Sequence, residues 1–523
     1  MPGAGEQRTE AYIKYSEGAA QPATPQSAPS SSGAASSDGR QAGAVRKSRR
    51  FRRTTLITVF CLAALAGIGL SRKINIEFGV IWLAALPVIL LIRSKSPLAL
   101  VAIIILGLGL GLWRGNTYMK NIHEFNSLAS SKVVIEARAT SDAIYSKRAQ
   151  IEFTANNIRL LEPYTKPIAG SFKISGFGER MIYRGDTVKV SGKFFPMRGG
   201  NQGRIAYAQL ERIKQGNNPV FNMTRQFSAG MQSALPEPNA SFGLGILVGQ
   251  RATMPAELTA ALTAVGLVHI VAVSGYNLTI IVRAISRLKL GSKYQKLLVS
   301  LTLITIFILV TGFSASIVRA AIVSVLSLWA WYYGRSINGV TLIAFTAALT
   351  GLIKPYFVWS DLGWYLSFLA FFGVLVIAPL LASRLFKHSP KVLAMILIET
   401  LCAEIMTLPL IMMSFSQLSL IGLLANLLVV PLVPVAMLFS AVAGAAGAVI
   451  PSLAGWFAWP ANLLLTFILD LVRLLSGVPF ASVKATISPL SMIFLYLTVF
   501  LLVVIFHRRV LKNKQIIKNW LGV

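Results

Sequence analysis

The stretch that decides the fold is Gly243–Arg283, GLGILVGQRATMPAELTAALTAVGLVHIVAVSGYNLTIIVR. It is apolar enough to lie in a membrane, yet it carries Arg251, His269, Ser274 and Asn277 with five glycines among them. Polar or broken backbone at membrane depth is tolerated where protein shields it or where it lines a water-filled cavity. The stretch therefore predicts short or re-entrant helices that line a passage, rather than one straight span.

Composition predicts a membrane protein with an anionic partner. The chain has 523 residues, of which 54% are hydrophobic, and its mean hydropathy is +0.64. These values are typical of an integral membrane protein. The formal net charge is +31, and residues 114–225 hold 18 Lys and Arg against 8 Asp and Glu, a net +10. A basic domain between membrane segments predicts a polyanion or anionic lipid as partner.

The first 113 residues are predicted to form a tail and a set of membrane spans. Residues 1–45 are rich in Ala, Ser, Gly, Pro and Gln and cannot bury enough apolar surface to fold, so we expect a disordered cytoplasmic tail. Residues 46–113 begin with the basic block Arg46–Arg53, which favours a cytoplasmic N-terminus and could also contact anionic lipid or nucleic acid. Three predicted spans follow the block: Thr54–Leu70, Ile74–Ile92 and Pro97–Trp113.

Residues 114–225 are predicted to form a small all-β domain outside the cytoplasm, because three crossings from inside end there. Five runs alternate apolar and polar residues and are broken at short intervals by Gly, Pro and Asp. About five strands in this length suit an OB-like barrel, which binds single nucleic-acid strands through basic grooves and stacking aromatic rings. The runs are VVIEARA (133–139), AQIEFTANNIRLL (149–161), GSFKISGF (170–177), DTVKVSGKFF (186–195) and RIAYAQLERI (204–213).

This domain carries both kinds of side chain that single-strand binding needs. An alternative interpretation is that most of its aromatic rings belong to the barrel core. The aromatic residues are Tyr145, Phe153, Phe172, Phe177, Tyr183, Phe194 and Phe195. The candidate DNA-binding cations are Lys147, Arg148, Lys173, Arg180, Arg184, Lys189 and Lys193, with Arg198 and Arg204 also in the domain.

Residues 226–507 return to the membrane, and residues 508–523 form a basic tail that we expect in the cytoplasm. Several of the predicted spans are short or broken by Pro and Gly. They are Gln295–Phe313, Ser316–Tyr333, Val340–Ile353, Leu362–Leu381, Val392–Ser414, Leu418–Pro434, Ala436–Ile450, Phe457–Leu475 and Ile487–Phe506.

Charged residues inside these spans are candidates for function, because each costs about 2.5–3.5 kcal/mol at a helix centre. Arg319 suits either a phosphate in a pore or an acidic partner on a neighbouring helix. Glu399 and Glu404 lie in one span without an assigned role. Two further acidic residues have local interpretations: Asp361 as a helix cap, and Asp470 as the i, i+3 partner of Arg473.

No catalytic or metal-binding motif stands out, so we expect a protein that is not an enzyme and that needs no metal or cofactor. The four histidines and two cysteines show no metal-ligand spacing. His269 with Ser274 could in principle pair as base and nucleophile, but Ser274 does not stand in a GxSxG elbow. The chain has no Walker A sequence, so driven transport would need a separate motor. The histidines are His123, His269, His388 and His507, and the cysteines are Cys61 and Cys402.

Several motifs, in order along the chain, resemble the ComEC family of DNA-uptake channels of natural competence. The resemblance covers roughly residues 235–435, whereas residues 54–215 match that family in layout only. The motifs are LVGQR (247–251) with Met254-Pro255, GLVHIVAVSG (266–275), RAA (319–321), YGR (333–335), DLGWYLSF (361–368), TLPL (407–410) and GLLANLL (422–428) with Pro431.

The resemblance implies an inner-membrane channel of a bacterium that passes one DNA strand into the cytoplasm. Two departures from the family pattern change the expected site. Many relatives carry a histidine two residues after the SG pair, where this chain has Tyr276 and Asn277. Asn keeps hydrogen bonding and loses titration. Many relatives also end in a metallo-β-lactamase-like domain with a presumed nuclease role, and we expect strand degradation to reside in another protein.

The favoured hypothesis is a passive conduit for single-stranded DNA. Conduction needs weak sites in series, which neutral polar groups and a few cations would supply. Expected partners are the DNA strand, membrane lipid, a membrane DNA receptor, a separate nuclease and a cytoplasmic motor ATPase. The candidate path residues are Arg251, His269, Ser274, Gly275, Asn277, Arg319, Arg335, Ser367 and Asn426.

The alternative hypothesis is a polytopic enzyme or transporter that acts on lipid-linked precursors. It would need a catalytic acid pair that faces a lipid cleft, and Glu399 and Glu404 are the only candidates in the sequence.

Overall fold

The computed structural model describes most of the chain between its two ends. The predicted tail 1–45 and almost all of the predicted span 74–92 lie outside the described residues. The described residues are 53–74, 97–126, 128–145, 150–168, 170–179, 181–196, 203–216, 219–250, 253–271, 292–311, 315–335, 338–386 and 392–511.

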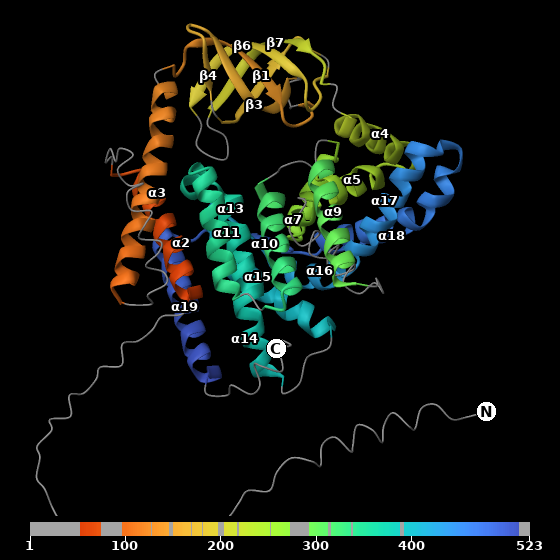
Figure 1. Ribbon diagram of the computed structural model, residues 1–523. Helices are drawn as coiled ribbons and strands as arrows, with labels where there is room; N and C mark the ends of the chain where they lie inside the picture. Colours follow the sequence, from red (N-terminus) through yellow and green to blue (C-terminus); the bar gives the residue numbers. More distant parts are fainter. Residues whose placement is uncertain are drawn as a thin grey trace, which may run out of the picture. The chain divides into compact units, whose positions relative to one another are not determined.

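Helices make up most of the described chain (Figure 1). The α-helices are α2 Arg53–Leu70, α3 Pro97–Asn126, α4 Pro219–Ala234, α5 Asn239–Val248, α6 Ala256–Ala264, α7 Val268–Val271, α9 Lys293–Thr311, α10 Ala315–Tyr332, α11 Gly339–Ile353, α12 Tyr356–Ser360, α13 Leu362–Phe372, α14 Ala378–Leu385, α15 Val392–Phe415, α16 Gly422–Val429, α17 Val433–Val449, α18 Ala454–Ser476 and α19 Pro489–Leu511. A π-helix, η2 Gly373–Ile377, joins α13 to α14, and a 3₁₀ turn, η3 Pro451–Leu453, precedes α18.

Membrane-spanning helices confirm the predicted fold class. Five helical segments among the described residues are long and apolar enough to cross a membrane, and the pair α16 and α17, bent by 53°, would add a sixth. Two shorter apolar helices, α10 and α11, lie between the second and third of these segments in the sequence. The chain is therefore a polytopic α-helical membrane protein with one inserted β domain.

Some predicted spans differ from the elements of the structure, and tertiary pairing explains one difference. The predicted span Leu418–Pro434 begins as a strand, because Gln417–Ser419 (β8) pairs antiparallel with Ser482–Lys484 (β9). The helix that contains the predicted span Pro97–Trp113 continues to Asn126 in α3. Its candidate membrane span by length and hydropathy is Ala99–Lys120.

The first two described helices pack unusually closely. Gly107, Gly111 and Gly115 recur every four residues along α3 and form one face against α2. A Cβ at Gly111 would overlap the carbonyl oxygen of Ala64, and one at Gly67 would overlap that of Leu108. Small residues at such spacing let helix backbones approach each other in lipid, where hydrophobic association contributes little.

Polar contacts attach this helix pair to the rest of the membrane domain. The Arg114 Nε donates to the Leu352 carbonyl oxygen at 2.8 Å, and its Nη2 donates to the Ile353 carbonyl at 3.1 Å. The cation therefore satisfies the last carbonyls of α11, where the helix dipole favours positive charge. The Trp359 Nε1 donates to the Ile68 carbonyl oxygen at 2.7 Å.

The β domain is a closed barrel with the strand order of an OB fold. Of its five long strands, counted along the chain without the short β2 and β4, the first pairs with the second and the fourth. The third pairs in parallel with the fifth. The remaining neighbours in the barrel are antiparallel. The strands are β1 Lys132–Ala139, β2 Ile144–Tyr145, β3 Ile151–Glu162, β4 Lys166–Ile168, β5 Phe172–Phe177, β6 Thr187–Pro196 and β7 Gly203–Lys214.

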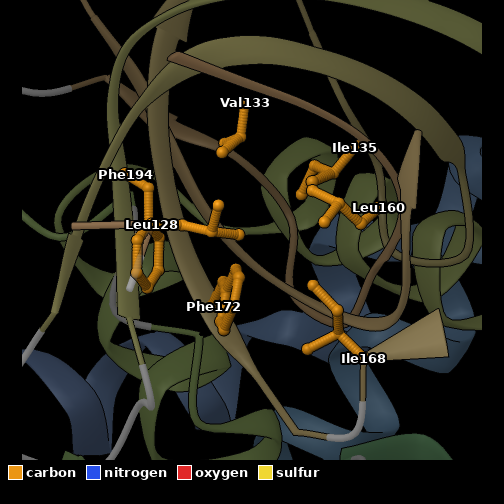
Figure 2. Close-up of a pocket in the computed structure, with 7 residues that line it drawn as sticks. All are labelled: Leu128, Val133, Ile135, Leu160, Ile168, Phe172 and Phe194. Atoms are coloured by element: carbon orange, nitrogen blue, oxygen red, sulfur yellow. The ribbon is translucent and has the colours of Figure 1, made fainter. Parts of the chain in front are cut away.

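Alternating side chains of these strands fill the barrel with hydrocarbon. Figure 2 shows a small pocket in this interior whose lining side chains contain only carbon. Phe153, Phe172 and Phe194 belong to the core, so the alternative interpretation holds for these three rings. The pocket is lined by Leu128, Val133, Ile135, Leu160, Ile168, Phe172 and Phe194.

The largest apolar cluster of the membrane domain surrounds α5. Residues 239–246 of this helix are all buried, and α4, α17 and α18 contribute to the same cluster. The Asn239 side-chain amide donates to the Asn462 Oδ1 at 2.6 Å, which ties α5 to α18. A Cβ at Gly230 in α4 would come within 2.7 Å of the Gly444 carbonyl oxygen in α17.

We expect Gly111→Leu to destabilise the pairing of α2 with α3 by about 1–3 kcal/mol or more, because the new side chain meets backbone that cannot move aside. Thermal unfolding of the purified protein in detergent measures the loss. Gly109→Leu is the matched control, since a Cβ at Gly109 would meet no atom within 4 Å. Equal losses in both variants would contradict the glycine contact.

Candidate functional site

The stretch that carries the motifs forms short helices where the structure describes it. The helices α5, α6 and α7 are 10, 9 and 4 residues long, which confirms the prediction of short helices. Gly245 lies against Val271, so at this point the glycine serves close packing rather than a passage wall. Four path candidates, Arg251, Ser274, Gly275 and Asn277, lie outside the described residues.

A glycine turn positions the histidine of this stretch. Gly266 has φ +73°, a conformation that favours glycine, and a Cβ there would lie 3.3 Å from the Ser419 Cβ. The Ser419 hydroxyl donates to the Ala264 carbonyl oxygen at 2.9 Å. The short two-stranded sheet of β8 and β9 therefore holds the loop that precedes α7.

His269 presents one ring nitrogen to its surroundings. Its Nδ1 lies 2.9 Å from the Gly266 carbonyl oxygen, and because a carbonyl only accepts, Nδ1 carries the proton. His269 is exposed, so its ring lies at a surface of the protein. Nε2 is then the atom left for a ligand on that surface.

Arg319 is the most unusual polar residue of the membrane domain. Its side chain is 2% exposed, its Nη2 donates to the Gly363 carbonyl oxygen at 3.0 Å, and its guanidinium lies 5.8 Å from the centre of the Phe368 ring. The Nε and Nη1 atoms have no hydrogen-bond partner among the described residues. Buried N–H donors without partners are rare because each one loses its hydration without compensation.

Asp361 is near Arg319 but is already engaged. As predicted, it caps a helix: its carboxylate accepts from the Trp364 backbone N–H at 3.1 Å at the start of α13. It also acts on the Arg319 guanidinium through its charge. The Arg319 guanidinium therefore lies near the start of α13, the Asp361 carboxylate and the Phe368 ring.

Two other path candidates lie at different places along these helices. Arg335 is exposed just beyond the end of α10, 16 residues after Arg319. That spacing corresponds to about 24 Å of helix, so the two cations do not share one site. Ser367 is half-buried on α13, one turn from Gly363.

Asn426 and Glu404 form a polar contact between α15 and α16. The Asn426 side-chain amide donates to a carboxylate oxygen of Glu404. Asn426 is 3% exposed, and its Oδ1 has no partner among the described residues. The prediction of Asn426 as a polar site residue missed this carboxylate, which gives it a fixed orientation.

The two acids needed by the alternative hypothesis do not form a pair. Glu399 and Glu404 are five residues apart on α15, which places their side chains about 140° apart around the helix. Glu404 is bound by Asn426. Among the described residues, no group of three or more His, Cys, Asp or Glu could hold a metal ion.

The barrel cations predicted to bind DNA differ in their surroundings. Lys147, Arg148 and Arg180 lie outside the part of the chain whose side chains are described. Lys173 forms an ion pair of 2.8 Å with Glu152, whereas Lys189 and Lys193 are exposed on β6.

Arg184 belongs to a structural joint between the barrel and α4. Its guanidinium lies 4.7 Å from the centre of the Phe221 ring, and burial lowers its pKa against the raising influence of Asp142. Beside it, the fully buried Asp186 accepts from the Gly216 backbone N–H at 2.8 Å and lies 3.8 Å from Arg225 Nη2. No spacing in the sequence indicates this joint, because its residues lie before β6, after β7 and on α4, which are separate segments of the chain.

Comparison with known proteins assigns the membrane region. A family described as competence protein matches residues 246–510. The chain belongs to the competence protein family. The match begins in α5 and ends in α19, so it extends further toward the C-terminus than the resemblance read from the motifs, and the barrel lies outside it.

One curated member supports the resemblance to the ComEC family. ComE operon protein 3 of Bacillus subtilis (strain 168) is 25% identical over 303 residues. These are 57% of this chain and 38% of that protein, so the chain spans well under half the length of its curated relative. No solved structure matches this competence protein significantly.

We expect Asn426→Leu to destabilise this competence protein by about 1–3 kcal/mol, because Glu404 loses the amide that satisfies it. The double variant Glu404→Leu with Asn426→Leu should recover most of the loss, since it leaves no half-buried carboxyl without a partner. Thermal unfolding in detergent measures all three proteins. A double variant no more stable than Asn426→Leu would contradict a mutual contact.

Proposed function

We propose that this protein is an inner-membrane conduit that passes single-stranded DNA into the cytoplasm of a bacterium during natural transformation. The competence family supports the process, and the polytopic helical fold supports a membrane path. The observation that carries the proposal is Arg319, a buried guanidinium whose Nε and Nη1 nitrogen atoms have no hydrogen-bond partner among the described residues.

A phosphate group would satisfy what Arg319 lacks. Guanidinium N–H groups form strong, charge-assisted hydrogen bonds with phosphate oxygens. In this arrangement, however, Phe368 and the start of α13 cover the guanidinium, so a strand reaches it only if α10 and α13 separate. In the proposed path, this arrangement would therefore be a closed state at this depth.

The other path candidates would act as weak serial sites. His269, Ser367 and Asn426 offer neutral hydrogen-bonding groups, and Arg335 offers a cation at the far end of α10. Arg251, Ser274, Gly275 and Asn277 complete the proposed path by their positions in the sequence. Weak contacts of this kind allow a strand to move on.

The barrel is proposed to receive the strand on the outer side of the membrane, with the N-terminus in the cytoplasm. Its net positive charge and OB topology support this role. A membrane DNA receptor, a separate nuclease and a cytoplasmic motor ATPase would supply the remaining steps, because we assign no catalytic role to this chain. The alternative function in lipid-linked precursor chemistry has no acid pair to support it.

We expect Arg319→Leu to lower the transformation frequency at least about tenfold, while the protein still accumulates in the membrane. The factor corresponds to losing one charge-assisted hydrogen bond of about 1.5–3 kcal/mol. Removing a buried, incompletely satisfied charge should not lower the thermal stability. Transformation frequency and the amount of membrane-inserted protein are measured together.

Arg473→Leu is the control, since Arg473 forms an exposed local ion pair of 3.1 Å with Asp470. Its transformation frequency should stay within about twofold of wild type. Normal transformation by Arg319→Leu would remove the proposed phosphate role. Loss of the folded protein in Arg319→Leu would show that the residue is structural.

A further inference from the structure

The outer face of β1, β6 and β7 has a charge pattern that the sequence does not reveal. Lys132 on β1 lies directly opposite Lys193 on β6. Like charges directly opposite each other on a sheet destabilise it. Neither lysine forms an ion pair within the described residues. This row of the sheet therefore has an uncompensated positive charge.

Three other barrel cations, Lys189, Lys173 and Arg204, have a carboxylate as neighbour. Lys189 lies on the same strand four residues before Lys193, but its cross-strand partners are Glu136 on one side and Glu211 on the other. On β5 and β7, Lys173 and Arg204 both contact Glu152, at 2.8 and 3.4 Å.

Two aromatic rings adjoin the uncompensated row. The register between β6 and β7 shifts next to Lys193, and within the shift Tyr207 has φ +54° and is 66% exposed. A bulge of this kind redirects a side chain, and bulges are common beside binding sites. Phe195 is half-buried and lies two residues after Lys193 on the same face of β6. The Lys193 ammonium is 5.8 Å from the centre of its ring.

We propose that a single DNA strand binds the barrel across β1, β6 and β7, with phosphates at Lys132 and Lys193 and a base stacked on Tyr207. This surface differs from the face of the second and third strands that OB folds commonly use, which here is formed by β3 and β5. The inference rests on the proposed function and specifies where the strand is received.

A DNA strand would bind here because this surface offers a phosphate site and a ring for base stacking next to each other. A phosphate between Lys132 and Lys193 removes their mutual repulsion, and an exposed ring beside it accepts any base. On the β3–β5 face, Glu152 would repel the phosphate that Lys173 would attract. An anionic lipid headgroup would use the lysines but would not need the ring of Tyr207.

The test uses the full chain in discs of neutral lipid, with a labelled oligothymidine as probe and its Kd measured over a range of salt. In wild type, log Kd rises linearly with log salt. We expect Lys193→Gln or Lys132→Gln to lower that slope by about 0.7 each, the value for one phosphate contact with a single strand. Lys189→Gln, the matched control on the same strand and face, should leave the slope unchanged.

The stacking part of the proposal is tested with Tyr207→Asn, because Asn tolerates the positive φ that this position requires. We expect the Kd to rise roughly fivefold or more with little change in the salt slope. Thermal unfolding like that of wild type would establish that the barrel is intact.

Three outcomes would overturn the inference. If Lys173→Gln lowers the slope and Lys193→Gln does not, the strand uses the β3–β5 face, and the proposed conduit function still stands. If Lys193→Gln weakens attachment to vesicles with anionic phosphatidylglycerol but leaves DNA binding unchanged, then Lys132 and Lys193 bind lipid headgroups rather than DNA. If wild type binds no oligothymidine and a deletion strain transforms normally, the proposed function fails as well.

Discussion

Close approach of helix backbones at glycine is the constraint on which the membrane domain depends. In lipid, helices gain little from hydrophobic association, so their contacts rest on packing at short range. Gly111 against Ala64 joins α3 to α2, and Gly230 against Gly444 joins α4 to α17. At Gly373, which begins the π-helix, a Cβ would lie 2.5 Å from the Cys402 carbonyl oxygen of α15.

Such packing leaves little room for polar groups, so the few polar side chains buried inside the membrane domain are candidates for function. Arg319 and Asn426 are almost completely buried, and each retains polar atoms without partners among the described residues. Tight packing and unsatisfied donors are compatible in the proposed path if the helices separate when a strand enters. The contact between Arg319 and the start of α13 is where we expect that separation to begin.

Local patterns predicted most elements well, and distant contacts account for the failures. Apolar runs predicted α9, α10 and α11 within two residues at each end, because hydropathy is a property of each segment. The strand β8 was missed since its partner β9 lies more than 60 residues away. The Asn426 contact with Glu404 and the Asp186 joint were missed for the same reason: each combines residues from separate elements.

The sequence by itself determined that this chain crosses a membrane repeatedly, that it carries a basic β domain, and that its motifs resemble a competence family. Those properties follow from composition, periodicity and local order along the chain. Only the tertiary structure decided which charges are compensated. Lys189 and Lys193 look equivalent in sequence, yet Lys189 has two glutamates as cross-strand partners and Lys193 faces Lys132. Strand register sets those neighbours, and Coulomb interactions at such short range then separate a lysine flanked by two carboxylates from one that faces another lysine and is proposed to bind a phosphate.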